Sequence, residues 1–71
     1  MLRVPASALL QRGQLEIVFV VTDQRAQLRL VKTGKRIGPE IEVVSGVVAG
    51  EQVVTEGTAQ LRDQQPVQVK P

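Results

Sequence analysis

Valine content is the feature that most constrains the fold of this chain, since thirteen of its 71 residues are valine. Val and Ile lose side-chain freedom in a helix but pack well on a pleated surface, so this content favours strands. The clearest strand is expected from Leu15 to Thr22, where apolar residues occupy both alternating faces. Such a strand belongs in the centre of a fold. Phe19, the single aromatic residue, shares a face with Ile17 and Val21 and is expected in the core.

Further strand patterns recur along the chain and are separated by turn residues. They predict strands at Ala26 to Thr33, Glu40 to Val44, Gln52 to Glu56 and Pro66 to Val69. A hairpin connection is expected at residues 23–25, and single helical turns at residues 47–50 and 58–61, the second capped by Thr58. The sequence therefore predicts an all-β fold: a small, mostly antiparallel β-roll or barrel-like domain with one or two short helical turns, forming a single domain over residues 1–71.

Glycines mark the expected turns, because glycine adopts positive φ angles without steric cost. The glycines assigned to structural turns are Gly34, Gly46, Gly50 and Gly57. The stretch from Gly34 to Pro39 begins with glycine and ends in Gly-Pro, and proline removes a donor from a strand ladder. This stretch is therefore predicted to form a projecting loop.

Charged residues give a weak signal for partners. Nine Lys and Arg residues against seven Asp and Glu residues give a formal net charge of +2, and the basic residues are spread along the chain. Only the stretch from Lys32 to Arg36 approaches a cluster. Because a loop does not need charge in order to fold, the candidate residues for partner contact are Lys32, Lys35 and Arg36.

The composition excludes most catalytic chemistry. The chain has no His, Cys, Trp or Tyr, so it holds no Cys nucleophile, no His general base and no Cys/His zinc site. Four acidic residues could supply oxygen ligands to a metal ion: Glu40, Glu42, Glu51 and Glu56. Glu40 and Glu42 alternate with core residues at strand spacing, so all four are interpreted as solvated strand faces. No catalytic residue, cofactor or metal is predicted, and the chain is not expected to be an enzyme.

The order of several short motifs resembles a known protein family. The motifs are Val4-Pro5 with Ala8-Leu9, Val18 to Val21, Val31 to Gly34, Ile41 to Gly57, Leu61 to Asp63 and Val67 to Val69. Together they resemble the C-terminal membrane-proximal domain of periplasmic adaptor (membrane fusion) subunits of resistance-nodulation-division efflux pumps. The departures are mild: Val47 stands for the usual Leu, Glu51 for the usual Asp and Gln64 for a frequent Gly.

This resemblance implies a non-catalytic docking module in the periplasm, at the inner membrane. It implies contact with the inner-membrane transporter and with other adaptor copies, an indirect link to an outer-membrane channel, and a role in the export of small molecules. We interpret residues 1–71 as an excised C-terminal part of a longer adaptor. In the family, chain from the adaptor's N-terminus completes this domain, so an exposed strand edge and self-association through that edge are expected.

A small basic β-barrel that binds RNA or DNA is the alternative function. Such modules usually stack bases on exposed aromatic side chains, whereas Phe19, the only aromatic residue, lies in an apolar strand. The adaptor hypothesis is therefore preferred, and no nucleic-acid partner is predicted.

Overall fold

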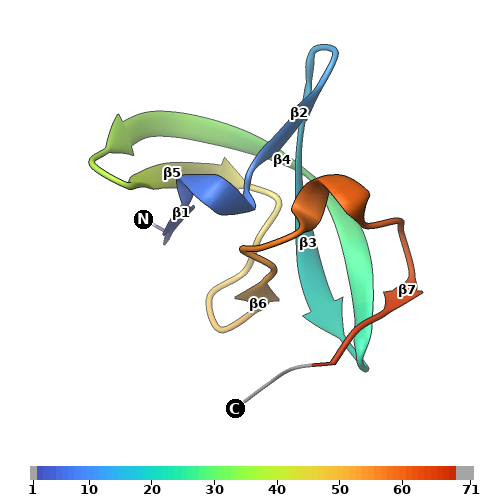
Figure 1. Ribbon diagram of the computed structural model, residues 1–71. Coiled ribbons are helices and arrows are strands. Elements are labelled where there is room, and N and C mark those ends of the chain that lie inside the picture. The colour runs from blue at the N-terminus through green and yellow to red at the C-terminus, as the bar shows by residue number, and fades with distance from the viewer. Residues whose placement is uncertain (1, 69–71) are drawn as a thin grey trace.

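Seven strands and two short 3-10 helices make up residues 2–68, the part of the chain that the computed structural model describes (Figure 1). The strands are β1 (Leu2–Pro5), β2 (Leu10–Arg12), β3 (Leu15–Thr22), β4 (Arg25–Ile37), β5 (Glu40–Ser45), β6 (Gln52–Val53) and β7 (Gln65–Pro66). The 3-10 helices are η1 (Ala6–Ala8) and η2 (Thr58–Gln60). Every strand pair among these residues is antiparallel. The predicted all-β fold with short helical turns is confirmed.

The thirteen-residue strand β4 organises the sheet by changing its partner halfway along. Its first half pairs with β3, from Thr22 opposite Arg25 to Glu16 opposite Val31. Its second half pairs with β5, which in turn pairs with β1. The sheet therefore runs β1-β5-β4-β3-β2, while β6 is added to β3 and β7 to the start of β4. Figure 1 shows β4 as one long curved strand that runs from beside β3 to beside β5.

The central strand β3 is buried on both faces, as its sequence predicts. Ile17, Val18, Phe19 and Val20 are each at most 3% exposed, and Phe19 is among the largest fully buried side chains. The main departure along this strand is Leu15, which is 54% exposed at the start of β3. A second cluster joins Val4, Ala8 and Val43 and connects β1, η1 and β5.

The strands β1 and β2 do not follow from the sequence patterns. Each is short, and each is held by a longer neighbour: β1 lies along β5 with Val4 opposite Ile41, and β2 lies along β3 with Leu10 opposite Ile17. Pro5 ends β1, a position where a missing N–H costs least. Tertiary pairing, which has no local sequence signal, defines both strands.

The second half of the chain is less regular than predicted. The strand expected from Gln52 to Glu56 is only β6, residues 52–53, and the expected helical turn at 47–50 is instead a reverse turn in which the Glu51 N–H donates to the Val48 carbonyl (3.1 Å). The turn at 58–60 is helical, but Gly57 in the left-handed conformation precedes it and Thr58 makes no capping bond. Val69, the expected end of the last strand, lies outside the described residues.

Positive φ angles occur at three of the four glycines assigned to turns: 106° at Gly46, 92° at Gly50 and 68° at Gly57. Gly34 differs, because β4 continues through it to Ile37 and the chain reverses only at Gly38-Pro39. The predicted loop from Gly34 to Pro39 is therefore wrong, and the candidate contact residues lie on a strand. No helix within residues 2–68 has the length and hydropathy needed to cross a membrane.

Candidate docking surface

The basic residues singled out from the sequence lie on a projecting β-hairpin. This hairpin, here called the arm, consists of residues 32–45 and joins the second half of β4 to β5 (Figure 1). Lys32 lies at its base opposite Ser45, and Arg36 lies near its tip opposite Ile41. Lys35 precedes Arg36, and all three basic side chains are exposed. The arm thus carries the three cations along one strand and does not gather them at one point.

Gly34 shapes the arm through a β-bulge. Between the pairs Thr33–Val43 and Arg36–Ile41, β4 contains Gly34 and Lys35 where β5 contains only Glu42. The extra residue leaves the Lys35 N–H to donate to the Glu42 carboxylate (3.1 Å). A Cβ on Gly34 would lie 3.2 Å from that same carboxylate oxygen. Gly34 therefore lies in a strand with the Glu42 side chain close to its backbone, which corrects its assignment to a turn.

A second irregularity on β5 offsets the first. Lys32 pairs with Ser45 and Thr33 with Val43, so Val44 is an extra residue on β5. The pairing at the tip of the arm, Ile37 with Glu40, is then in the same register as the pairing at its base. Two opposed bulges bend the ladder without shifting it, which explains why a simple alternation of polar and apolar residues does not identify this part of β4.

The three cations do not stabilise the fold through ion pairs. Within residues 2–68, the only ion pair joins Arg29 and Glu51. Arg36 donates from Nε to the Gly38 carbonyl (3.2 Å), which holds its guanidinium over the tip of the arm. Two carboxylates beside the arm accept hydrogen bonds from neutral donors: Glu42 accepts from the Lys35 N–H (3.1 Å), and Glu16 accepts from the Thr33 hydroxyl (2.6 Å). The three cations are therefore available to a partner, on an arm that also carries Glu40 and Glu42.

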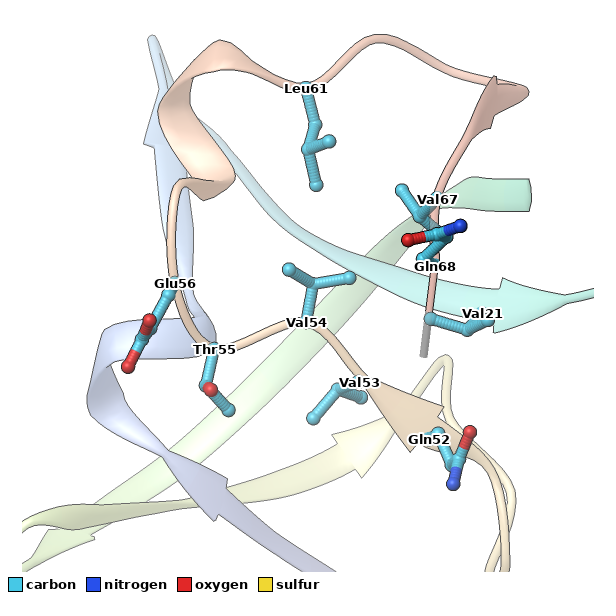
Figure 2. A pocket seen from close by; sticks show the side chains of 9 residues that line it. All are labelled: Val21, Gln52, Val53, Val54, Thr55, Glu56, Leu61, Val67 and Gln68. Atoms are coloured by element: carbon cyan, nitrogen blue, oxygen red, sulfur yellow. The ribbon is translucent and has the colours of Figure 1, made fainter. Parts of the chain in front are cut away.

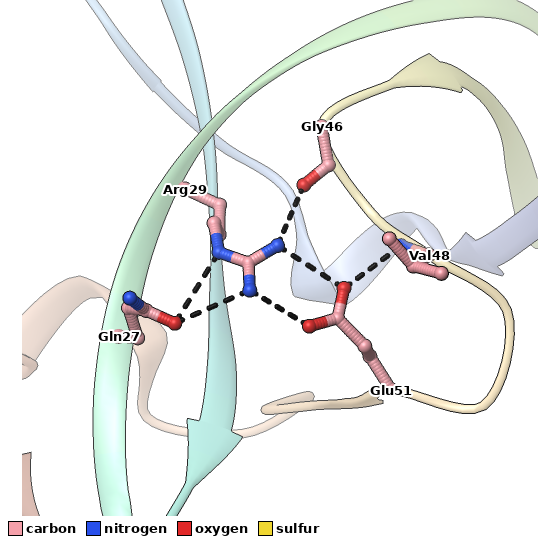
Figure 3. Close-up of polar contacts among 5 residues, drawn as sticks. All are labelled: Gln27, Arg29, Gly46, Val48 and Glu51. Carbon is pink, nitrogen blue, oxygen red and sulfur yellow. Dashed lines mark hydrogen bonds and ion pairs between the residues drawn. The ribbon is translucent and has the colours of Figure 1, made fainter.

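The Arg29–Glu51 pair is the centre of a polar network that sequence analysis missed (Figure 3). Arg29 Nη2 lies 2.7 Å from Glu51 Oε2, and Nη1 lies 3.1 Å from Oε1. Arg29 also donates to the Gly46 carbonyl (3.1 Å) and to the Gln27 side chain, while the Val48 N–H donates to Glu51 (2.8 Å). The network ties β4 to the connection between β5 and β6. Glu51 is thus a structural residue and not the solvated group predicted; the one local sign was its position directly after a glycine turn.

Stability is expected to fall at acid pH because of this network. Hydrogen bonds from the Arg29 side chain and then from the Val48 N–H hold the pKa of the Glu51 carboxyl below its ordinary value. A lowered folded-state pKa adds stability that is complete above the unfolded-state pKa and is lost as the pH falls through the folded-state pKa. Thermal melting from pH 7 to pH 3 measures this loss. The Glu51→Gln variant lacks this carboxyl, so its melting temperature is expected to fall less between pH 7 and pH 3. An equal fall in the two proteins contradicts the contribution of Glu51 to acid sensitivity.

A shallow groove lies between the end of β3, β6 and the C-terminal segment that follows β6 (Figure 2). It has a volume of about 840 Å³, and its apolar lining is formed by Val21, Val53, Val54, Leu61 and Val67. Gln52, Thr55, Glu56 and Gln68 complete the lining. Leu61 thus contributes to this groove and is only partly buried. Across the described ranges, no three His, Cys, Asp or Glu side chains gather as metal ligands. The groove offers surface for packing and no pair of groups suited to acid–base chemistry.

These features define a small β-barrel-like domain with a projecting arm that carries three exposed cations. The family model described as "YknX, C-terminal permuted SH3-like domain" matches residues 1–69, and the chain belongs to this family. It is an adaptor domain of the membrane fusion protein type, so the predicted class of protein is confirmed at that level. No curated protein matches the chain. Nothing favours the nucleic-acid alternative, since Phe19 is fully buried and cannot stack on a base.

Proposed function

We propose that this domain is the docking module of an adaptor in a tripartite resistance-nodulation-division efflux pump. In this proposal it lies in the periplasm at the inner membrane, packs on the periplasmic part of the transporter beside other adaptor copies, and supports export of small molecules without catalysing a reaction. The outer-membrane channel is an indirect partner. The observation that carries the proposal is the family match over residues 1–69, since an adaptor domain acts by binding other pump components.

The arm is the proposed transporter contact. Its cations are exposed and make no ion pair with other described residues, so the fold gains little from them. Arg36 is nevertheless positioned by the Gly38 carbonyl, and Lys35 by the bulge at Gly34. Exposed charges on a rigid hairpin raise the rate of encounter with an oppositely charged partner. Such an arrangement suits docking more than folding.

Charge reversal on the arm tests this role in the full-length adaptor. Lys35→Glu combined with Arg36→Glu is expected to leave the fold intact and to weaken transporter association by about tenfold or more, mainly through the association rate and with strong salt dependence. Association is measured with purified transporter at two salt concentrations, and drug resistance is measured in cells. Arg12→Glu combined with Arg62→Glu is the matched control, because it makes the same charge change at exposed positions away from the arm.

Two outcomes of this experiment separate the parts of the proposal. Normal association and normal drug resistance in the arm variant eliminate the arm as the contact. Copurification of the adaptor with a transporter of another class contradicts the assignment to a resistance-nodulation-division pump and leaves the docking role in place.

Self-association through strand edges is a further part of the proposal. The sheet ends at β1 on one side and β2 on the other, and no strand within residues 2–68 covers the outer edge of either. Unpaired N–H and C=O groups on such edges are templates for pairing with another copy. Sedimentation equilibrium of the 71-residue chain is expected to show a fraction of dimer that increases with protein concentration. A monomer at every concentration up to the millimolar range contradicts this expectation.

A further inference from the structure

The second half of β4 has a backbone edge without a partner strand. β3 pairs with β4 only as far as Glu16 opposite Val31, whereas β5 begins to pair with β4 at Lys32. From Lys32 to Ile37, β4 is therefore bonded along one edge by β5, and no other strand in the described part of the chain pairs with its second edge. Figure 1 shows the β2–β3 hairpin and the arm projecting in different directions from this point.

This edge has the length that recognition of an extended peptide requires. At about 3.3 Å per residue, residues 32–37 span about 20 Å, which is the length of a typical strand. β5 and β1 back the edge with two further strands, and Val43 and Val4 of those strands are buried in one cluster. An added strand would thus extend a sheet that is already anchored in the core. Addition of a strand to an exposed edge is a recurrent mode of peptide binding.

The charges beside the edge select the chemistry of the added strand. Lys32, Lys35 and Arg36 all lie on β4 itself, where they would be next to an added strand. The carboxylates nearby belong to other strands: Glu16 to β3, where it accepts from the Thr33 hydroxyl, and Glu40 and Glu42 to β5. Pairing with a second copy of this segment would bring the three cations of each strand close together, which disfavours that pairing. An extended segment rich in Asp or Glu would instead place opposite charges across the new pair. Charge therefore disfavours pairing of this edge with a second copy of itself and favours pairing with an acidic strand.

We propose that the edge of β4 from Lys32 to Ile37 binds an extended acidic segment of a partner protein by adding it to the sheet as a strand. This inference rests on the proposed docking role of the arm and specifies the kind of segment it docks. Backbone hydrogen bonds along the edge supply affinity, and the three cations supply preference for carboxylates. Ile37, which is 38% exposed, offers an apolar contact at the end of the edge.

A synthetic peptide of about ten residues that alternates Glu and Thr is the probe. Two control peptides are used: one replaces each Glu with Lys, and the other keeps every Glu but has its two central residues replaced by proline. Adjacent prolines remove a donor on whichever edge of the peptide faces β4. Calorimetry on the chain is expected to show binding of the probe about tenfold or more tighter than either control. Amide exchange is expected to slow within residues 32–37.

Variants of the chain complete the test. Lys35→Glu with Arg36→Glu is expected to weaken binding of the probe about tenfold, and Arg12→Glu with Arg62→Glu is expected to leave it unchanged. Equal binding of the proline peptide, or slowed exchange at β1 or β2 in place of β4, overturns strand addition at this edge. If these peptide results fail while arm reversal still releases the transporter, the docking role stands and this inference is wrong. If the peptide results hold and transporter association is normal, the edge binds a different partner.

Discussion

Phe19→Ala is expected to cost about 3–5 kcal/mol of the free energy of unfolding, a large part of the stability of a domain of this size. Phe19 is fully buried in the middle of β3, which has β4 along one edge and β2 and β6 along the other. Its carbonyl also accepts the Val54 N–H (2.9 Å), so the residue lies where β6 joins the sheet. Truncation therefore leaves a cavity at the junction of three strands, where the structure has little freedom to collapse. Chemical denaturation of the two chains measures the loss.

Leu15→Ala is the matched control for this substitution. Leu15 lies on the same strand, but its side chain is 54% exposed, so its truncation is expected to change stability by less than about 1 kcal/mol. Similar losses in the two variants contradict the placement of Phe19 in the core.

Burial of β3 could be predicted because its signal is contained in eight consecutive residues. Apolar side chains on both faces of residues 15–22 have one simple explanation, a strand with neighbours above and below. The turn at Asp23 and Gln24, where both φ angles are positive, is short enough to fix the hairpin that follows. For β1, β2 and β6, in contrast, two to four residues are too few to show a period. Their strand character comes from the longer strands beside them, which local sequence does not encode.

The candidate site was only partly predictable for a similar reason. The three cations were identifiable by type and proximity in the sequence, but the bulges at Gly34 and Val44 break the alternation that marks a strand. A glycine in a bulged strand, such as Gly34 beside Glu42, then has the same sequence signature as a glycine required by a turn. The Arg29–Glu51 pair joins residues 22 positions apart, and nothing in one sequence indicates that these two side chains meet.

Gly46→Val is expected to destabilise the fold by about 3 kcal/mol or more, because backbone strain and steric overlap act together. Gly46 has a φ angle of 106°, which β-branched residues avoid. A Cβ at this position would overlap the Leu30 carbonyl oxygen and would lie 2.8 Å from Val31 Cγ1 and 2.9 Å from Val31 Cα. Two of these atoms are backbone atoms of β4, next to the point where β4 exchanges β3 for β5, so the main chain itself must move.

Displacement of residue 46 would also weaken the Arg29–Glu51 network, because the Gly46 carbonyl accepts a hydrogen bond from Arg29 (3.1 Å).

Gly57→Val is the control that separates backbone strain from steric overlap. Gly57 has a φ angle of 68° but no atom within 4 Å of the added Cβ, so its substitution carries conformational strain alone and is expected to cost about 1–2 kcal/mol. Denaturation of both variants gives the comparison. If Gly46→Val lowers the free energy of unfolding no more than Gly57→Val does, the close contact of residue 46 with the β4 backbone is wrong.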